Sequence, residues 1–230
     1  MRNTLKIIEP AVLVAVPAVL VLCALFKTDY AALLSAAVVV LSLLPFFFRY
    51  ELEKPRPRDM MPIVVLTAIA VIGRIAFGPI QNFQPVTAIV IVAGLYFGKQ
   101  NGFLAGAFAA LASNMFFGQG AWTPWQMYAW GLAGYLAGSL RQTVLFKSKL
   151  GIYIYGAAVS LLFGAVMDSY FLIGFVQQVT PASVAAAYLA GLPLNLAHAA
   201  STVIFLVLVL VPWGKKIDRI KQKYELSDSR

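Results

Sequence analysis

The feature that most constrains this chain is a series of apolar stretches, each long enough or nearly long enough to cross a membrane. We place them at residues 10–26, 30–48, 60–77, 84–98, 101–118, 122–140, 150–175 and 182–212. A helix needs about 20 apolar residues to cross the hydrocarbon core. The chain is 61% hydrophobic and only 12% charged, which excludes an ordinary soluble domain. The sequence therefore predicts an all-α integral membrane protein with about eight transmembrane helices.

Lysine and arginine residues predict the orientation of these helices. With both termini placed in the cytoplasm, all but two of the 18 basic residues lie in cytoplasmic segments. The exceptions are Lys27, which lies outside, and Arg74, which lies within a span. Because positive residues concentrate on the cytoplasmic side, we expect a multi-pass protein of the cell (cytoplasmic) membrane with both termini cytoplasmic. No convincing cleavage site follows MRNTLKIIEP, so no cleaved signal peptide is predicted.

The most polar internal segment, ELEKPRPRD at 51–59, divides the chain as a charged cytoplasmic linker. The two spans before it hold almost no polar side chains and the six after it hold nearly all of them. We therefore expect an accessory transmembrane hairpin at 1–50 and a six-helix membrane core at 60–213 that carries the function. Residues 214–230 form a basic cytoplasmic tail that is expected to rest on anionic lipids, with a partner contact as the alternative. No internal repeat is evident, which counts against transporters built from inverted repeats.

Polar and aromatic side chains of the core gather in its outer half. The stretch SNMFFGQGAWTPWQMYAWG at 113–131 holds much of this group, at one turn between two spans. Polar residues at depth usually face a bundle interior or a watery cavity. We therefore expect an outward-facing pocket whose ligand-binding residues are Arg74, Phe83, Gln84, Asn114, Phe117, Gln119, Trp122, Trp125, Gln126, Tyr128, Asp168, Asn195 and His198.

Several of these residues have plainer interpretations. Trp122 and Trp125 could belong to the aromatic belt at the membrane interface. Arg74 could reach the outer headgroups, or could pair with Asp168 as a structural ion pair between helices.

The amide and imidazole side chains also have structural alternatives. Asn114 and Asn195 could hydrogen-bond between helices, and His198 could be a core residue bound to a neighbouring helix. The coincidence of many such residues at one depth favours a pocket.

Glycines recur at four-residue spacing in two of the core spans. They are Gly102 and Gly106 in one span and Gly134 and Gly138 in another. Such spacing lets helix backbones approach closely. Tight packing within this chain is the favoured interpretation, and a surface for a membrane partner is the alternative.

The core also carries motifs that resemble a known family. Gly73-Arg74 lies near a helix end, Phe83-Gln84-Pro85-Val86-Thr87 opens the next helix, and a glycine-rich hairpin runs from Gly98 to Gly106. With these traits, the core resembles the substrate-binding S component of energy-coupling factor (ECF) vitamin transporters, most clearly over its first four helices. The N-terminal hairpin departs from the usual six-helix pattern.

The resemblance implies a binding protein rather than an enzyme or a channel. It would capture a vitamin outside, dock with a transmembrane coupling subunit driven by two cytoplasmic ATPases, and topple to carry its pocket inward. The chain has no GxxxxGK[ST] phosphate loop, so ATP hydrolysis is expected in the partners. No cofactor, metal or nucleic acid is expected. The residues that would contact the coupling subunit are Ala68, Ala70, Gly94 and Ala105.

The expected ligand is a ring-bearing organic molecule, because flat aromatic faces accompany a few directional hydrogen-bonding groups. The hairpin around Gly118-Gln119-Gly120 resembles the proposed cobalamin members more than the riboflavin ones. Cobalamin or a related corrinoid is therefore the preferred ligand. Riboflavin, folate or another vitamin precursor stay open.

Two other functional classes fit part of the same sequence. An intramembrane transferase would need a carboxylate cluster for Mg²⁺ or a His-Asp pair for acid–base work. Asp168 is the only acid predicted at depth, and His198 lies about a span away. A proton-coupled secondary transporter could use the same two residues as a relay.

Overall fold

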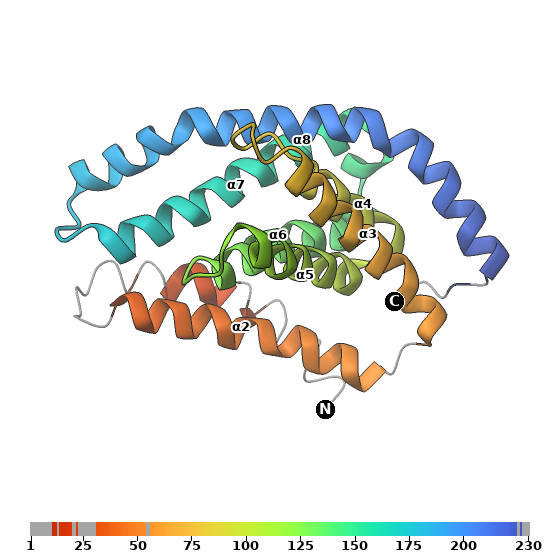
Figure 1. The fold of residues 1–230 in the computed structure, drawn as a ribbon, viewed down its shortest axis with the longest axis horizontal. Helices are drawn as coiled ribbons and strands as arrows, with labels where there is room; N and C mark the ends of the chain where they lie inside the picture. Colours follow the sequence, from red (N-terminus) through yellow and green to blue (C-terminus); the bar gives the residue numbers. More distant parts are fainter. Residues whose placement is uncertain are drawn as a thin grey trace.

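The computed structural model describes residues 11–12, 14–19, 22, 31–53, 56–224 and 226, and these residues form helices and connecting turns without strands. Part of the expected first span, 10–26, and Lys27 lie outside the described residues. The predicted all-α class is confirmed. The elements (Figure 1) are α2 (Ala31–Glu53), α3 (Pro57–Ala76), α4 (Val86–Phe97), α5 (Lys99–Phe117), α6 (Thr123–Leu140), the 3₁₀ turn η1 (Val144–Lys147), α7 (Lys149–Phe175) and α8 (Pro181–Tyr224).

Length and composition make this a helical membrane protein. Among the described helices, α3, α7 and α8 are long and apolar enough to cross a membrane. Shorter apolar helical segments occupy residues 36–48 and α4. A helix of 12 residues rises only about 18 Å, so α4 depends on its neighbours within the hydrocarbon core.

Those neighbours surround α4 almost completely. It contacts α3, α5, α6, α7 and α8, and all but two of its residues are buried. A helix that is apolar on every face is stable only inside a larger assembly. α4 is therefore the central element against which the ends of the other helices are positioned.

Glycines bring α4, α5 and α6 into backbone contact. A Cβ on Gly94 would collide with the carbonyl oxygen of Gly134, and a Cβ on Gly102 would collide with that same carbonyl group and with the Cα of Gly94. A Cβ on Gly134 would in turn strike the Gly102 carbonyl. The predicted tight packing within the chain is confirmed.

The second helix of the N-terminal hairpin packs on the core. Phe46 of α2 is buried, stacks on Phe103 of α5 with ring centroids 3.7 Å apart, and meets Tyr135 of α6 edge-on at 5.4 Å. α2 contacts α7 as well. The described part of the hairpin is thus attached to the bundle through aromatic contacts.

Two predicted boundaries differ from the structure. The linker expected at 51–59 is mostly helical, because α2 continues to Glu53 and α3 already begins at Pro57. Arg56 stays extended at φ −63° and ψ 145°, since a residue before proline avoids the helical region. The tail expected from 214 is largely the continuation of α8, which stays helical to Tyr224 although it contains Pro193 and Pro212.

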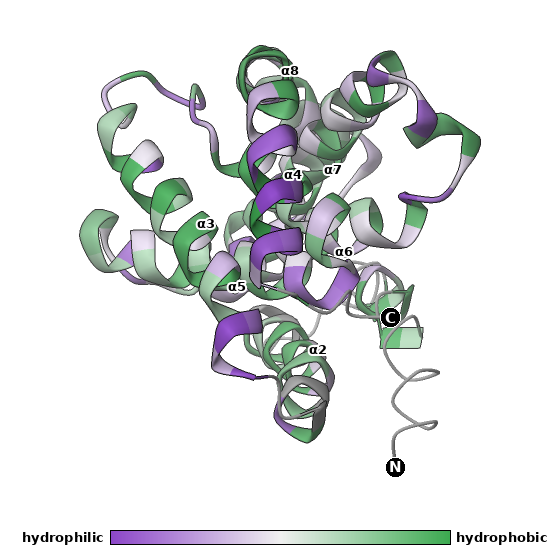
Figure 2. Cartoon of the chain, turned by 90° about the vertical axis from the view of Figure 1, so that its right-hand side faces the viewer, coloured by the Kyte–Doolittle hydropathy of each residue, from purple (hydrophilic) through white to green (hydrophobic). Residues whose placement is uncertain are grey.

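Basic residues lie at one end of the bundle. We call this the basic end; it holds the α2–α3, α4–α5 and α6–α7 connections and the last turns of α8. Every described lysine and arginine except Arg74 lies there. Figure 2 looks onto this end, where hydrophilic turns stand among largely apolar helices. The opposite end holds the α3–α4, α5–α6 and α7–α8 loops.

Candidate functional site

Arg74 is the one described cation in the half of the bundle toward the opposite end. It lies in the last turn of α3, and its Nη1 donates to Ser113 Oγ at 2.5 Å and to Asn114 Oδ1 at 2.8 Å on α5. Its Cζ stands 5.0 Å from the ring centroid of Phe117 and 4.9 Å from that of Trp130. Aromatic faces attract a guanidinium at this distance, so two rings and two oxygens hold the charge in place.

Asn114 connects Arg74 to the α5–α6 turn. The Asn114 side chain is buried, and its Nδ2 donates to Thr123 Oγ1 at 3.0 Å and to Gln126 Oε1 at 2.8 Å. Thr123 Oγ1 donates to Gln119 Oε1 at 2.9 Å. Each of these amides therefore has a partner, and the turn between α5 and α6 is held by its own polar side chains.

Trp130 links this network to a second one in the bundle interior. Its Nε1 donates to Thr87 Oγ1 at 3.0 Å, and the same Thr87 oxygen lies 2.8 Å from His198 Nε2. Phe163 stacks on Trp130 at 4.7 Å and meets the His198 ring edge-on at 5.0 Å. His198 is 2% exposed. Helices α4, α6, α7 and α8 thus contribute side chains to one buried polar and aromatic cluster.

Asp168 belongs to a separate contact between α7 and α8. Asn195 Nδ2 donates to Asp168 Oδ2 at 2.8 Å. Glycines make room for both side chains, because a Cβ on Gly191 would strike the Asp168 carboxylate and one on Gly164 would strike the Asn195 amide. Arg74 and Asp168 are both described, and no ion pair joins them. The expected alternative of a structural Arg74–Asp168 pair is wrong.

The acid–base pair needed by a transferase or a proton relay is also not assembled. His198 is bonded to Thr87 and Asp168 to Asn195, so the two titratable side chains have different partners. Among the described residues no group of three His, Cys, Asp or Glu side chains converges to hold a metal ion.

The tryptophans of the α5–α6 turn separate into two kinds. Trp122 is 37% exposed, as an interfacial ring would be, whereas Trp125 and Tyr128 are fully buried. The Trp125 ring lies 5.7 Å from that of Tyr170 on α7, and its indole N–H has no hydrogen-bond partner among the described residues. A belt position is therefore excluded for Trp125. A buried donor without an acceptor is uncommon and costly.

Phenylalanine substitutions should distinguish the two buried indoles. Trp125→Phe removes an unpaired N–H, whereas Trp130→Phe removes the same atoms and also the hydrogen bond to Thr87. We expect Trp130→Phe to destabilise the purified protein by about 1–2 kcal/mol more than Trp125→Phe. Thermal or detergent unfolding measures the difference. Equal losses would show that the Trp130 hydrogen bond contributes nothing.

The remaining predicted residues lie around this cluster. Phe83 packs with Phe77 and Phe205. The Gln84 backbone N–H donates to Ser201 Oγ at 2.8 Å, which ties the α3–α4 loop to α8. Phe117 and Gln119 are largely exposed on the α5–α6 turn.

The residues expected to contact a coupling subunit are mostly interior. Ala70, Gly94 and Ala105 are buried, with Gly94 against the backbone of α6. Ala68 is exposed on α3. It lines an apolar groove of about 520 Å³ between α3 and α5.

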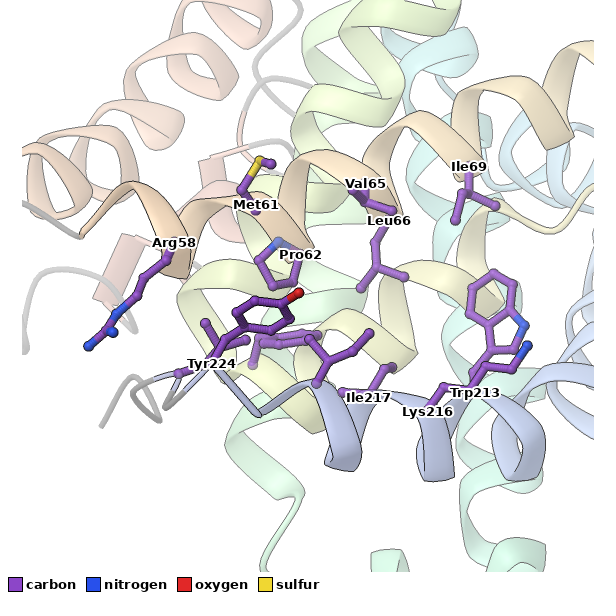
Figure 3. A pocket seen from close by; sticks show the side chains of 13 residues that line it. Arg58, Met61, Pro62, Val65, Leu66, Ile69, Trp213, Lys216, Ile217 and Tyr224 are labelled. Atoms are coloured by element: carbon purple, nitrogen blue, oxygen red, sulfur yellow. The ribbon is translucent and has the colours of Figure 1, made fainter. Parts of the chain in front are cut away.

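A large cavity lies at the basic end, away from Arg74. It holds about 680 Å³ between α3 and the last turns of α8. In Figure 3, Pro62 and Leu66 of α3 face Ile217 and the Trp213 ring of α8 across it. Its walls are apolar, with Arg58 and Lys216 as the charged lining residues.

Sequence reasoning missed three members of the polar cluster. Ser113 accepts from Arg74, while Thr87 and Trp130 join the two networks. Thr87 stood within the quoted helix-start motif and Trp130 within the aromatic stretch, so the signal was present. Trp130 follows Gln126 by four residues on α6 and so lies one helical turn deeper, and Thr87 lies in the first turn of α4.

Comparison with known proteins gives one result. The family described as "Family of unknown function (DUF6580)" matches residues 54–214, which is well over half of the chain. No curated protein and no solved structure matches.

Proposed function

We infer that this chain, which belongs to the DUF6580 family of unknown function, is a membrane-embedded subunit that captures a small molecule. It would be the S component of an ATP-driven ECF-type vitamin importer, with a six-helix core formed by α3 to α8 and the N-terminal hairpin as an addition. Ligand would bind near Arg74 at the opposite end of the bundle.

The observation that carries this proposal is that the Arg74 guanidinium has no carboxylate partner among the described residues. Two neutral oxygens and two aromatic rings hold its guanidinium, but no described carboxylate pairs with it. A guanidinium has five N–H donors, and the described hydrogen bonds use Nη1 alone. A buried or half-buried charge is normally paired. A ligand oxygen would supply the missing partner.

The charge distribution supports the orientation of this site. Described lysines and arginines other than Arg74 lie at the basic end, and positive residues favour the cytoplasmic side. The basic end would then face the cytoplasm, with both termini there and about eight spans in the cell membrane. Arg74 would lie near the outer surface, where a vitamin arrives.

Partner docking is proposed on the exposed side of α3. This helix buries few of its apolar residues within the chain, and Met61, Val64 and Ile72 are each more than half exposed. The groove that Ala68 lines between α3 and α5 is almost wholly apolar. The coupling subunit would bind there, and its two ATPases would hydrolyse ATP.

The preferred ligand is cobalamin or a related corrinoid, with riboflavin, folate or another vitamin precursor as alternatives. Aromatic rings beside a few fixed polar groups suit a large ring-bearing molecule. Trp125 adds a buried N–H donor that no described residue uses.

The test is thermal unfolding of the detergent-purified chain with cyanocobalamin, cobinamide, riboflavin or folate. A protein that binds one of them is stabilised by about 2.7 kcal/mol when the free ligand stands at 100 times its Kd. A selective rise in Tm with one vitamin supports the capture role and identifies the ligand. No shift with any of them would contradict it. Copurification of ATPases is the second readout.

A further inference from the structure

We propose that a second site, at the basic end, binds a phosphate-bearing anion: a phospholipid headgroup or a soluble phosphate. This inference does not depend on the ligand of the opposite end. The site is a cavity of about 580 Å³ formed by the α6–α7 connection, the end of α4 and the last turns of α8. We call it the basic cavity after its cationic lining residues, Arg141, Lys147, Lys149, Lys215 and Lys221.

The charges of the basic cavity are strongly unbalanced. Its five cations face a single carboxylate, that of Asp218. Arg141, Lys147, Lys149 and Lys215 form no ion pair with any described residue. Like charges gathered around one cavity repel one another, and a bound anion would remove that repulsion. Arginine and lysine are the side chains that proteins use for phosphate.

The walls of the basic cavity are fixed by close contacts between its elements. Lys221 Nζ donates to the Tyr96 carbonyl at 3.0 Å, which ties α8 to the end of α4. A Cβ on Gly214 would strike the Tyr96 hydroxyl, and one on Gly151 would strike the Leu145 carbonyl. The cations therefore project from elements that are packed together rather than from a loose tail.

The remaining lining residues favour a lipid as the source of the phosphate. Leu95, Phe146, Ile152, Leu210 and Val211 line the same cavity as the cations. A cavity with an apolar side and a cationic side, at the end of a membrane bundle, fits a headgroup with the first carbons of its chains. Basic pockets between membrane helices bind anionic lipids in this way.

The neighbouring cavity shows that this chemistry is not a general property of the basic end. The 680 Å³ cavity between α3 and α8 has two cations, Arg58 and Lys216, and otherwise mostly apolar walls. The same helix, α8, thus presents Lys215 and Lys221 to the basic cavity, whereas Lys216 is its one cation among the residues that line the other.

Two triple variants of equal charge test the proposal. Lys147, Lys149 and Lys215 are changed to Gln in the first, which removes three cations of the basic cavity. Lys216, Arg219 and Lys223 are changed to Gln in the second, which removes three cations of α8 that do not line it. Both proteins are purified in detergent from nanodiscs of phosphatidylglycerol and phosphatidylcholine, and retained lipid is counted by native mass spectrometry.

Wild type should retain phosphatidylglycerol in preference to phosphatidylcholine. The first variant should retain about tenfold less, because it loses the charge-assisted hydrogen bonds of three lysines to the phosphate. The second variant should stay close to wild type. A parallel arm measures Tm with inorganic phosphate or pyrophosphate against chloride at equal ionic strength.

Each outcome has one meaning. Loss of phosphatidylglycerol from the first variant alone assigns the site to a lipid headgroup. Stabilisation of wild type by phosphate, absent in the first variant, assigns it to a soluble phosphate. Equal loss in both variants, or neither lipid preference nor phosphate effect in wild type, overturns the proposal.

Discussion

Gly134→Ala should destabilise the bundle, whereas the same substitution at Gly174 should not. The added methyl group at Gly134 would strike the carbonyl group and Cα of Gly102 on α5. Because backbone atoms cannot move aside as a flexible side chain can, α5 and α6 would have to separate. Overpacking of this kind costs about 1–3 kcal/mol, and a contact with backbone belongs at the upper end of that range.

Gly174 is the matched control because it also lies within a helix, α7, and a Cβ there meets nothing within 4 Å. Alanine is favoured over glycine in a helix by about 1 kcal/mol, so Gly174→Ala should be neutral or slightly stabilising. Unfolding of the two purified variants in mixed detergent measures the difference. Similar stabilities would mean that α5 and α6 are not in the close contact described.

Helix positions could be predicted from the sequence because each apolar run is a physical requirement of the membrane. The close packing of α5 on α6 could likewise be predicted, from Gly102, Gly106, Gly134 and Gly138. The residues at which helices end could be predicted less well. α8 runs 44 residues to Tyr224, since a helix can continue beyond the hydrocarbon core when its polar face meets water or headgroups.

The sequence predicts at which depth in the bundle the candidate site lies, but not toward which neighbour each side chain points. Residues at one depth can face α4, a neighbouring helix or the lipid, and a helix that is apolar on most sides gives no periodic signal that distinguishes them. Arg74, Asn114 and Gln126 do form one network. Asp168 and Asn195 lie at a comparable depth and bond only to each other among the described contacts.

Asn114→Asp should preserve the fold while it weakens ligand binding. The new carboxylate would accept from Arg74 Nη1 where Asn114 Oδ1 now does, at 2.8 Å. On the other side, the Gln126 amide can turn its nitrogen toward the carboxylate, and the Thr123 hydroxyl can donate to it in place of Gln119 Oε1. Arg74 would then carry its own counter-ion, so the stability of the ligand-free protein should be unchanged or higher.

The affinity of the Asn114→Asp protein for its ligand should fall, although the stability of the ligand-free protein does not. In the proposed site the unpaired charge of Arg74 attracts a ligand oxygen, and a carboxylate beside Arg74 weakens that contact. A hydrogen bond to a charged group is worth about 1.5–3 kcal/mol. Its loss therefore lowers the affinity about tenfold or more. The readout is the Tm shift with the vitamin that stabilises wild type. Asn101→Asp makes the same change in the first turn of α5, at the basic end, and should bind normally. A stable Asn114→Asp protein with an undiminished ligand shift would make Arg74 a structural cation, and the capture site would have to lie elsewhere.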